Sequence, residues 1–387
     1  MQELYVDTAD ALEQLCEQLA GSPWLAVDTE FVREKSYHPK LCLLQLCDGE
    51  IAACIDPLKL EDLAPLERLL LNSSGTKVFH AGRQDLEIFY LLWQRLPAPL
   101  FDTQLAATLL GLGEQVGYAA LVQKQLGVDL AKSHTRTDWS LRPLRQGQLR
   151  YALDDVIYLG RVYLALKGEL ERLGRIDWLA EEFAALADPA TYRIDPDTVW
   201  EKVKGRQRLK GAQLATLQVL AAWREKQALA ADRPRRWILQ DDPLIDLARQ
   251  APQSLEALSR IRGLEPGQLK RSGARWLELI AESRALPSSE WPSQSRPSKR
   301  ISANQEAIVD LLMSALRLLA EQQRTTPALL ASRQDLERLT AGSRDIDLLR
   351  GWRRKIAGDA LLSVLNGVLE PRLENGRLVL VKSAIRD

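Results

Sequence analysis

Two acidic side chains close the most apolar strand pattern in the chain, where they are placed to bind a cation. The segment over 24–31 reads WLAVDTEF, and Asp28 and Glu30 stand two positions apart near its end. Side chains two positions apart on a strand point to the same face of the sheet. Two like charges this close repel each other unless a cation lies between them, and carboxylate oxygens suit magnesium or manganese.

Further groups that could serve the same chemistry follow later in the chain. Asp85 comes after an apolar run and lies in the first turn of a predicted helix, which places it at the carboxyl edge of the sheet. Tyr151 and Asp155 are four positions apart on another predicted helix, so both lie on one face. Each pattern by itself is common in proteins, because acids at strand ends and near helix starts often have no catalytic role. Their order and spacing together are specific.

The elements that would position these groups alternate over the first hundred residues. Apolar runs over 24–31, 41–47 and 51–55 predict strands, and Asp48-Gly49 between the last two predicts a hairpin. Alternating helix and strand patterns follow. The arrangement predicts a mixed sheet that begins as an antiparallel meander, continues as strand–helix units and is flanked by helices.

Helical patterns dominate from about residue 103 onward. The long helix over 145–173 is followed by a polar, basic connection over 192–210 and by two helical blocks, over 205–286 and 302–378. The stretch between the blocks is rich in proline and serine, which predicts a linker. The two blocks share an order of long helix, loop and short helix, which is typical either of a repeated interaction module or simply of two amphipathic bundles.

Charge is divided unevenly along a chain whose net formal charge is zero. Residues 1–190 carry 18 Lys and Arg against 28 Asp and Glu, whereas residues 191–387 carry 34 against 24. Such asymmetry indicates contact with a polyanion or a membrane. The basic half holds three dense clusters, over 202–210, 233–236 and 350–355. They predict phosphate contacts, although solvated helix surfaces have similar composition.

Composition excludes several classes of protein. No run of 18 or more apolar residues occurs, so a membrane-spanning helix is not expected. The four cysteines lie within the first 54 residues without CxxC spacing, and the amino-terminal residues lack the basic head and apolar stretch of a signal peptide. We therefore expect no disulfide framework, no zinc knuckle and a cytoplasmic location.

The set of motifs resembles the DEDD exonuclease superfamily, which has an RNase H-like fold. Asp28 and Glu30 match its first motif, HAGRQDL at 80–86 matches its second, and Tyr151 with Asp155 matches the tyrosine form of its third. The histidine form would place a histidine five residues before the last acid, where this chain has Arg150.

The resemblance narrows to the ribonuclease D family. Its wider motif context is similar to VDTEFVREKSYHPKLCLLQL at 27–46, FDTQLAA at 101–107 and KSHTRTDWSLRPL at 132–144, and the helical blocks resemble HRDC domains. The resemblance implies an α/β exonuclease domain followed by two all-α HRDC-like bundles. The domains expected from it are an exonuclease over 1–190, HRDC-like blocks over 205–286 and 304–387, and a linker over 287–303.

The resemblance implies an enzyme that removes nucleotides from RNA 3′ ends by hydrolysis. The four acids would bind two divalent ions, Mg²⁺ or Mn²⁺, and Tyr151 would orient the attacking water. Nucleoside 5′-monophosphates would be released, no nucleotide cofactor would be needed, and precursors of tRNA would be the substrates. Further candidates for substrate contact are polar and aromatic residues near these motifs: Thr29, Phe31, His80, His134, Arg136, Trp139 and Arg142.

Three other functions stay open at this level. The acids do not separate RNA from DNA, because the 2′-hydroxyl is recognised by local contacts that spacing does not show. A non-catalytic RNA-binding adaptor would carry a dead nuclease site, although none of the acids is missing here. The helical blocks could also bind a protein partner.

Overall fold

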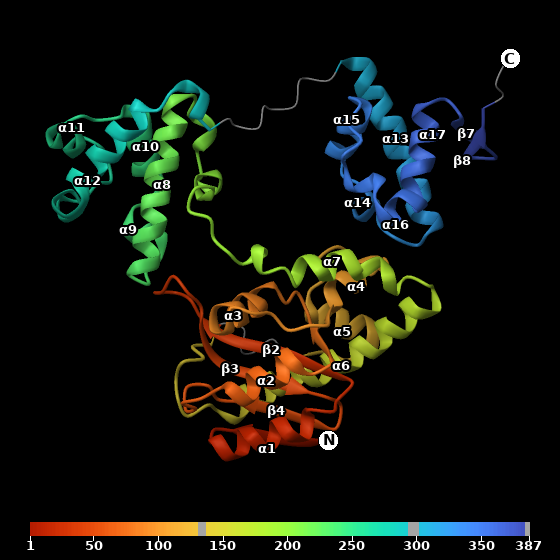
Figure 1. The fold of residues 1–387 in the computed structure, drawn as a ribbon. Coiled ribbons are helices and arrows are strands. Elements are labelled where there is room, and N and C mark those ends of the chain that lie inside the picture. The colour runs from red at the N-terminus through yellow and green to blue at the C-terminus, as the bar shows by residue number, and fades with distance from the viewer. Residues whose placement is uncertain (131–136, 293–301, 384–387) are drawn as a thin grey trace. The chain divides into compact units, whose positions relative to one another are not determined.

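The computed structural model describes residues 1–130, 137–292 and 302–383, which form two compact units (Figure 1). The first unit contains Met1–Glu30, Leu41–Thr191 and the carboxyl-terminal segment that begins at Arg300. The second contains the segment Phe31–Lys40 together with Tyr192–Lys299. The chain therefore leaves the first unit immediately after Glu30 and returns to it at Leu41.

A six-stranded mixed sheet forms the centre of the first unit, with the strand order β1-β4-β3-β2-β5-β6. Its strands are β1 (Gln2–Val6), β2 (Trp24–Val32), β3 (Lys40–Cys47), β4 (Ile51–Ile55), β5 (Thr76–Phe79) and β6 (Leu100–Asp102). The predicted hairpin is confirmed, since β3 and β4 pair antiparallel with Cys47 opposite Ala52. Strands β2, β5 and β6 run parallel, so their carboxyl ends meet at one edge of the sheet.

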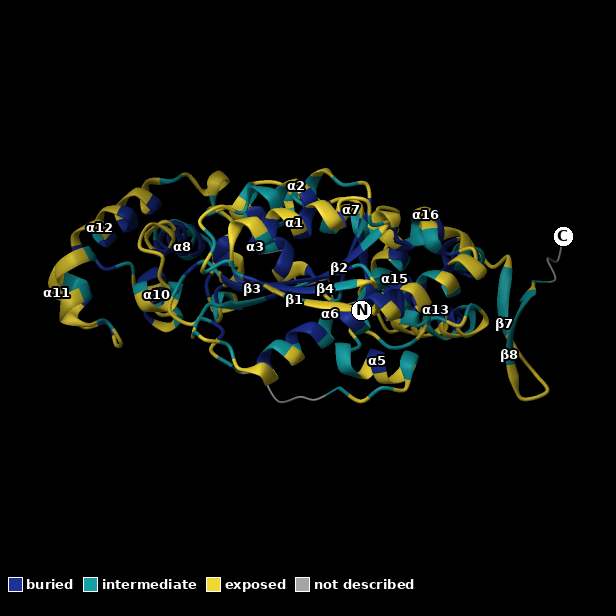
Figure 2. Cartoon of the chain, turned by 90° about the horizontal axis from the view of Figure 1, so that it is seen from below, coloured by how far each residue is buried: buried dark blue, intermediate teal, exposed yellow. Residues whose placement is uncertain are grey.

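Helices cover both faces of this sheet, which Figure 2 shows with α1, α2 and α3 on one side and α5 and α6 on the other. In the described part of residues 1–191 the α-helices are α1 (Ala9–Leu19), α2 (Ala64–Asn72), α3 (Arg83–Trp93), α4 (Thr103–Leu109), α5 (Tyr118–Leu126), α6 (Gln146–Arg172) and α7 (Ala180–Leu186). Burial on both faces explains why Leu41–Cys47 reads as a continuous apolar run rather than an alternating one. Asp102 caps α4 by accepting from the backbone N–H of Gln104 at 2.8 Å.

The second unit is a helical bundle around Trp276, whose side chain is fully buried. Its helices are α8 (Ala212–Ala230), α9 (Arg235–Ile238), α10 (Asp241–Gln250), α11 (Leu255–Ser259) and α12 (Pro266–Ala285). The basic connection predicted over 192–210 is in fact part of this core, because Val199, Trp200, Val203 and Leu209 are buried in it. Its charged residues alternate with the apolar side chains that anchor it.

The carboxyl-terminal segment begins as a second helical block but does not remain helical. Its helices are α13 (Ala303–Gln322), α14 (Pro327–Leu330), α15 (Arg333–Thr340), α16 (Gly351–Arg353) and α17 (Asp359–Leu365). The helical pattern predicted to residue 378 is wrong beyond 365. There β7 (Leu369–Glu374) and β8 (Arg377–Lys382) form an antiparallel hairpin, so this block is not all-α. Asn375-Gly376, both at positive φ, supplies the turn that this hairpin needs.

Candidate active site

The carboxyl end of β2 presents two acids to one pocket of the first unit. Asp28 and Glu30, together with Asp155 of α6, each offer an oxygen that lies within 4.8 Å of the others. The pocket has a volume of about 240 Å³, and its lining also includes Tyr151 and Thr29. Segments more than a hundred residues apart in sequence therefore converge on one acidic cluster.

Asp85 approaches this cluster from the first turn of α3 and is buried. Its Oδ1 accepts a hydrogen bond of 2.5 Å from Oγ1 of Thr29, the residue between the two acids of β2. Asp85 is not one of the three acids whose oxygens lie within 4.8 Å of one another. Its charge nevertheless raises the pKa of both Asp28 and Glu30, which places it in the same electrostatic site.

The acidic cluster holds protons unusually tightly. Burial, followed by the charges of Asp155 and Asp85, raises the pKa of Glu30 to about 8. Burial is also the largest cause that raises the pKa of Asp155 to about 7 and that of Asp85 to about 6. Burial and three neighbouring carboxylates raise the pKa of Asp28 well above its usual range. The residues fit divalent cations, because a bound cation would supply the positive charge that these carboxylates lack.

Tyr151 lies one helical turn before Asp155 on the pocket side of α6. Its hydroxyl hydrogen-bonds to the Asp155 carboxylate, and the buried ring of Trp139 packs against it with centroids 6.2 Å apart. Burial and the neighbouring acids raise the pKa of Tyr151 well above its usual range. The adjacent Asp154 instead forms an ion pair of 2.8 Å with Arg150, one turn earlier on the helix.

Tyr118 is a pocket residue that sequence reasoning missed. It begins α5, and its hydroxyl donates a hydrogen bond of 2.5 Å to the backbone carbonyl of Asp155. Its ring packs against that of His80, with centroids 5.4 Å apart, and both residues line the pocket. No metal-ligand spacing marks Tyr118 in the sequence. The only signal is an aromatic residue directly after Gly117 at a helix start.

Comparison with known proteins agrees with this geometry. A 3′–5′ exonuclease family model matches residues 4–171, and an HRDC domain model matches residues 213–280. Ribonuclease D of Gluconacetobacter diazotrophicus is 43% identical over 365 residues, which cover 94% of this chain and 92% of that protein. Ribonuclease D of Acidiphilium cryptum is 43% identical over 97% of this chain and 94% of its own length. The chain belongs to the ribonuclease D family.

A solved structure supports the same assignment for the fold. The crystal structure of Escherichia coli RNase D, described as an exoribonuclease involved in structured RNA processing, is 33% identical with a TM-score of 0.82. The match covers 95% of this chain and 99% of the E. coli protein. As a member of the ribonuclease D family, the chain is a hydrolytic 3′–5′ exoribonuclease of a divalent-metal-dependent superfamily.

The residues expected to contact the substrate in this ribonuclease D family member do not all lie in the pocket. His80 lines the pocket, and its Nδ1 is 2.9 Å from Oγ1 of Thr103. Phe31 is partly buried near the end of β2, in the segment Phe31–Lys40 that belongs to the second unit. Arg142 is held by Asp56 at 2.6 Å and by the carbonyl of Cys42 at 2.6 Å, so its guanidinium is directed at the protein. His134 and Arg136 lie outside the described residues.

No helix in the described parts of the chain is long and apolar enough to cross a membrane.

Proposed function

We propose that this enzyme shortens RNA by two-metal-ion hydrolysis at the cluster of Asp28, Glu30, Asp85 and Asp155. The observation that carries the proposal is the approach of three carboxylates within 4.8 Å of one another beside a tyrosine hydroxyl. When bound, two Mg²⁺ or Mn²⁺ ions would acidify the attacking water and stabilise the negative charge that develops on the phosphate. Hydrolysis at the bond to the last nucleotide would release nucleoside 5′-monophosphates.

Tyr151 has a positioning role in this proposal. Its raised pKa keeps the phenol protonated at neutral pH, so the residue does not act as a general base. The hydroxyl can still hold the attacking water through a hydrogen bond, and the buried Trp139 ring restricts the orientation of the phenol. Asp155 carries a carboxylate on the same helical face and would hold a cation next to that water.

The aromatic wall of the pocket supports recognition of a strand end. His80 and Tyr118 line the pocket that also holds the acids, and ring faces pack against a terminal base or ribose. The hydrogen bond from Tyr118 to the carbonyl of Asp155 ties this wall to the helix that carries the catalytic carboxylate. A terminal nucleotide that packs on the wall would therefore lie next to the acids.

Precursors of tRNA are the substrates that we propose for this enzyme. The E. coli relative is described as acting in the processing of structured RNA, and this chain matches an HRDC domain over residues 213–280. A helical module that holds the folded body of an RNA raises the local concentration of its single-stranded 3′ end. A cytoplasmic location remains a prediction from the sequence.

The direct test uses RNA labelled at the 5′ end and, separately, at the 3′ end, with a matched DNA oligonucleotide. We expect a descending ladder from the 5′ label and labelled mononucleotide from the 3′ label, both only when Mg²⁺ or Mn²⁺ is present. Asp155→Asn should abolish both products, whereas the matched variant Asp154→Asn on the same helix should retain them. Internal cleavage, metal-independent activity or an active Asp155→Asn variant would refute the proposal, and faster loss of DNA would refute the RNA preference.

A further inference from the structure

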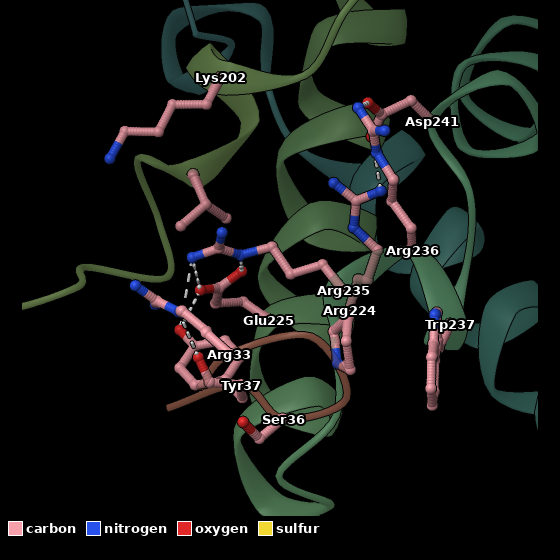
Figure 3. A pocket seen from close by; sticks show the side chains of 12 residues that line it. Arg33, Ser36, Tyr37, Lys202, Arg224, Glu225, Arg235, Arg236, Trp237 and Asp241 are labelled. Atoms are coloured by element: carbon pink, nitrogen blue, oxygen red, sulfur yellow. Dashed lines mark hydrogen bonds and ion pairs between the residues drawn. The ribbon is translucent and has the colours of Figure 1, made fainter. Parts of the chain in front are cut away.

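A second cavity, lined only by residues of the second unit, has a volume of about 520 Å³ (Figure 3). Three segments line it: the loop between β2 and β3, the 3₁₀ helix Val199–Lys202, and the stretch that runs from α8 through α9 to the start of α10. Five cationic side chains and only two acidic ones, Glu225 and Asp241, take part in the lining. The cavity is therefore electropositive.

A buried cluster fixes the loop to the helical bundle and forms one wall of the cavity. Glu225 of α8, almost fully buried, accepts hydrogen bonds from the Tyr37 hydroxyl and from Nη2 of Arg235 at 2.7 Å. The Arg235 guanidinium also lies over the Tyr37 ring, 5.2 Å from its centroid. Asp232 accepts from the backbone N–H groups of Tyr37 and His38 at 3.0 and 3.1 Å. These contacts give the loop a fixed shape within the second unit.

Both acids of the cavity are already neutralised by arginines of the unit itself. Glu225 pairs with Arg235, and Asp241 pairs with the buried Arg224 at 2.8 Å. Arg224 also donates to the carbonyl of Leu239 at 3.0 Å. The charges of these two acid–arginine pairs cancel. A ligand in the cavity would therefore meet the positive charge of the other lining cations.

The exposed side chains that line the cavity are two cations and one aromatic ring. Lys202 is exposed and has no ion-pair partner among the residues that the structure describes. Arg236 is 65% exposed, and its Nη2 lies 3.8 Å from Oδ2 of Asp241. Trp237, on the same short helix, is 57% exposed. Figure 3 shows Lys202 on one side of the Tyr37–Glu225–Arg235 cluster, with Arg236 and Trp237 on the other.

We propose that this cavity binds a single-stranded segment of the RNA substrate, with phosphates on Lys202 and Arg236 and a base stacked on Trp237. Cations that follow a backbone, beside an aromatic face open to solvent, are the elements of single-strand recognition. The inference rests on the proposed function, since it places the RNA upstream of the end being removed. The loop that lines the cavity follows β2, the strand that carries Asp28 and Glu30, and its first lining residue is Arg33.

The test is equilibrium binding of a fluorescein-labelled 20-nucleotide unstructured RNA to the full chain, measured by anisotropy in EDTA so that no hydrolysis occurs. Lys202→Gln with Arg236→Gln should raise Kd about 10- to 30-fold at 100 mM salt and reduce the slope of log K against log salt by about 1.4, because two single-strand contacts are lost. Trp237→Ala should raise Kd about fivefold or more, whereas Trp237→Phe should recover much of that loss.

Matched controls separate this site from general charge and stability effects. Arg262 and Lys270 are exposed cations of the same unit outside the cavity, so their double glutamine variant removes equal charge and should bind as wild type. Leu255→Ala is the corresponding control for an exposed apolar side chain. Wild-type affinity in the Lys202/Arg236 variant, equal losses in the control pair, or an unaffected Trp237→Ala variant would overturn the proposal. Because binding is measured without metal, this result is distinguishable from a failure of wild-type protein to hydrolyse RNA in Mg²⁺.

Discussion

Thr29 and Asp85 are joined by a hydrogen bond of 2.5 Å between Oγ1 and Oδ1, which links the end of β2 to the first turn of α3. Thr29 itself is buried between two metal-binding candidates, and its hydroxyl helps to lower a pKa that burial of Asp85 raises. A residue expected to meet the substrate through its backbone thus also positions a carboxylate through its side chain.

Replacing Thr29 by valine should weaken the metal site. The variant keeps the shape of the side chain but removes the hydroxyl, so the pKa of Asp85 should rise and protons should compete better with the cation. We expect the Mg²⁺ concentration for half-maximal RNA hydrolysis to increase about tenfold, in line with the effect of removing a partner of a metal ligand. Thr29→Ser retains the donor and should stay close to wild type. An unchanged Mg²⁺ requirement in Thr29→Val would contradict the positioning role.

Replacing Tyr151 by phenylalanine should lower kcat about 10²-fold, because the hydroxyl that orients the water is lost while the ring remains. KM should change little, since the substrate contacts attributed to other residues are intact. Steady-state hydrolysis of a short RNA measures both constants. Tyr158→Phe, on the same helix and without a place in the pocket, is the matched control. A normal kcat in Tyr151→Phe would remove Tyr151 from the mechanism.

Metal binding should depend on pH in the direction set by the raised carboxyl pKa values. Glu30, with a pKa of about 8, and Asp155, with a pKa of about 7, are substantially protonated at pH 6.5 in the metal-free protein. Cations must displace these protons, so Mg²⁺ affinity should increase as pH rises from 6 to 8.5 and protons should be released on binding. Calorimetry in buffers of different ionisation enthalpy measures the release. No proton release at pH 7 would show that the acids are already ionised.

The same pKa values set the stability of the metal-free protein. In its folded state the cluster binds more protons than in the unfolded chain between about pH 4 and 8, so the free energy of unfolding should fall as pH rises through this window. Mg²⁺ should therefore raise Tm more at pH 8 than at pH 6. Thermal denaturation in EDTA and in MgCl₂ measures the difference, and Asp155→Asn should reduce it. An equal Mg²⁺ effect at both pH values would contradict the shifts.

Much of the candidate site can be predicted from the sequence because its signals are local. Asp28 and Glu30 lie on a recognisable strand, and a spacing of four residues places Tyr151 and Asp155 on one face of their helix. Tyr118 was not predictable in this way, because its role depends on the packing of α5 against α6 and on a backbone carbonyl. Spacing along the chain carries no information about such a contact.

The helical regions show the same limit. The apolar residues of 199–209 are separated by charged ones, so the local pattern predicts a basic connection, although these apolar side chains complete the core around Trp276. In the last block the helical period predicts a helix past Asn375-Gly376, although this dipeptide favours a hairpin turn. The cavity at Tyr37 and Glu225 joins residues 188 positions apart, which no local pattern reports.

The docking of the last helical block within the first unit supplies a final prediction. Trp352 stacks on Trp178 with ring centroids 4.8 Å apart and planes 3° apart, and Arg353 pairs with Glu182 at 2.6 Å beside them. Both charged side chains are largely buried, so removing one alone leaves an unpaired buried charge.

Trp352→Ala should lower the free energy of unfolding of this unit by about 3 kcal/mol, because a buried aromatic contact is replaced by a cavity. Arg353→Ala and Glu182→Ala should each destabilise, and the double variant should be less destabilised than the sum of the two, with a coupling of about 1 kcal/mol or more. Urea denaturation measures all four proteins. Leu373→Ala, at a side chain that is 75% exposed on the hairpin, should change stability by less than about 0.5 kcal/mol. Additive losses in the double variant would mean that Arg353 and Glu182 do not interact in solution, and a Trp352→Ala variant as stable as Leu373→Ala would mean that the block does not dock there.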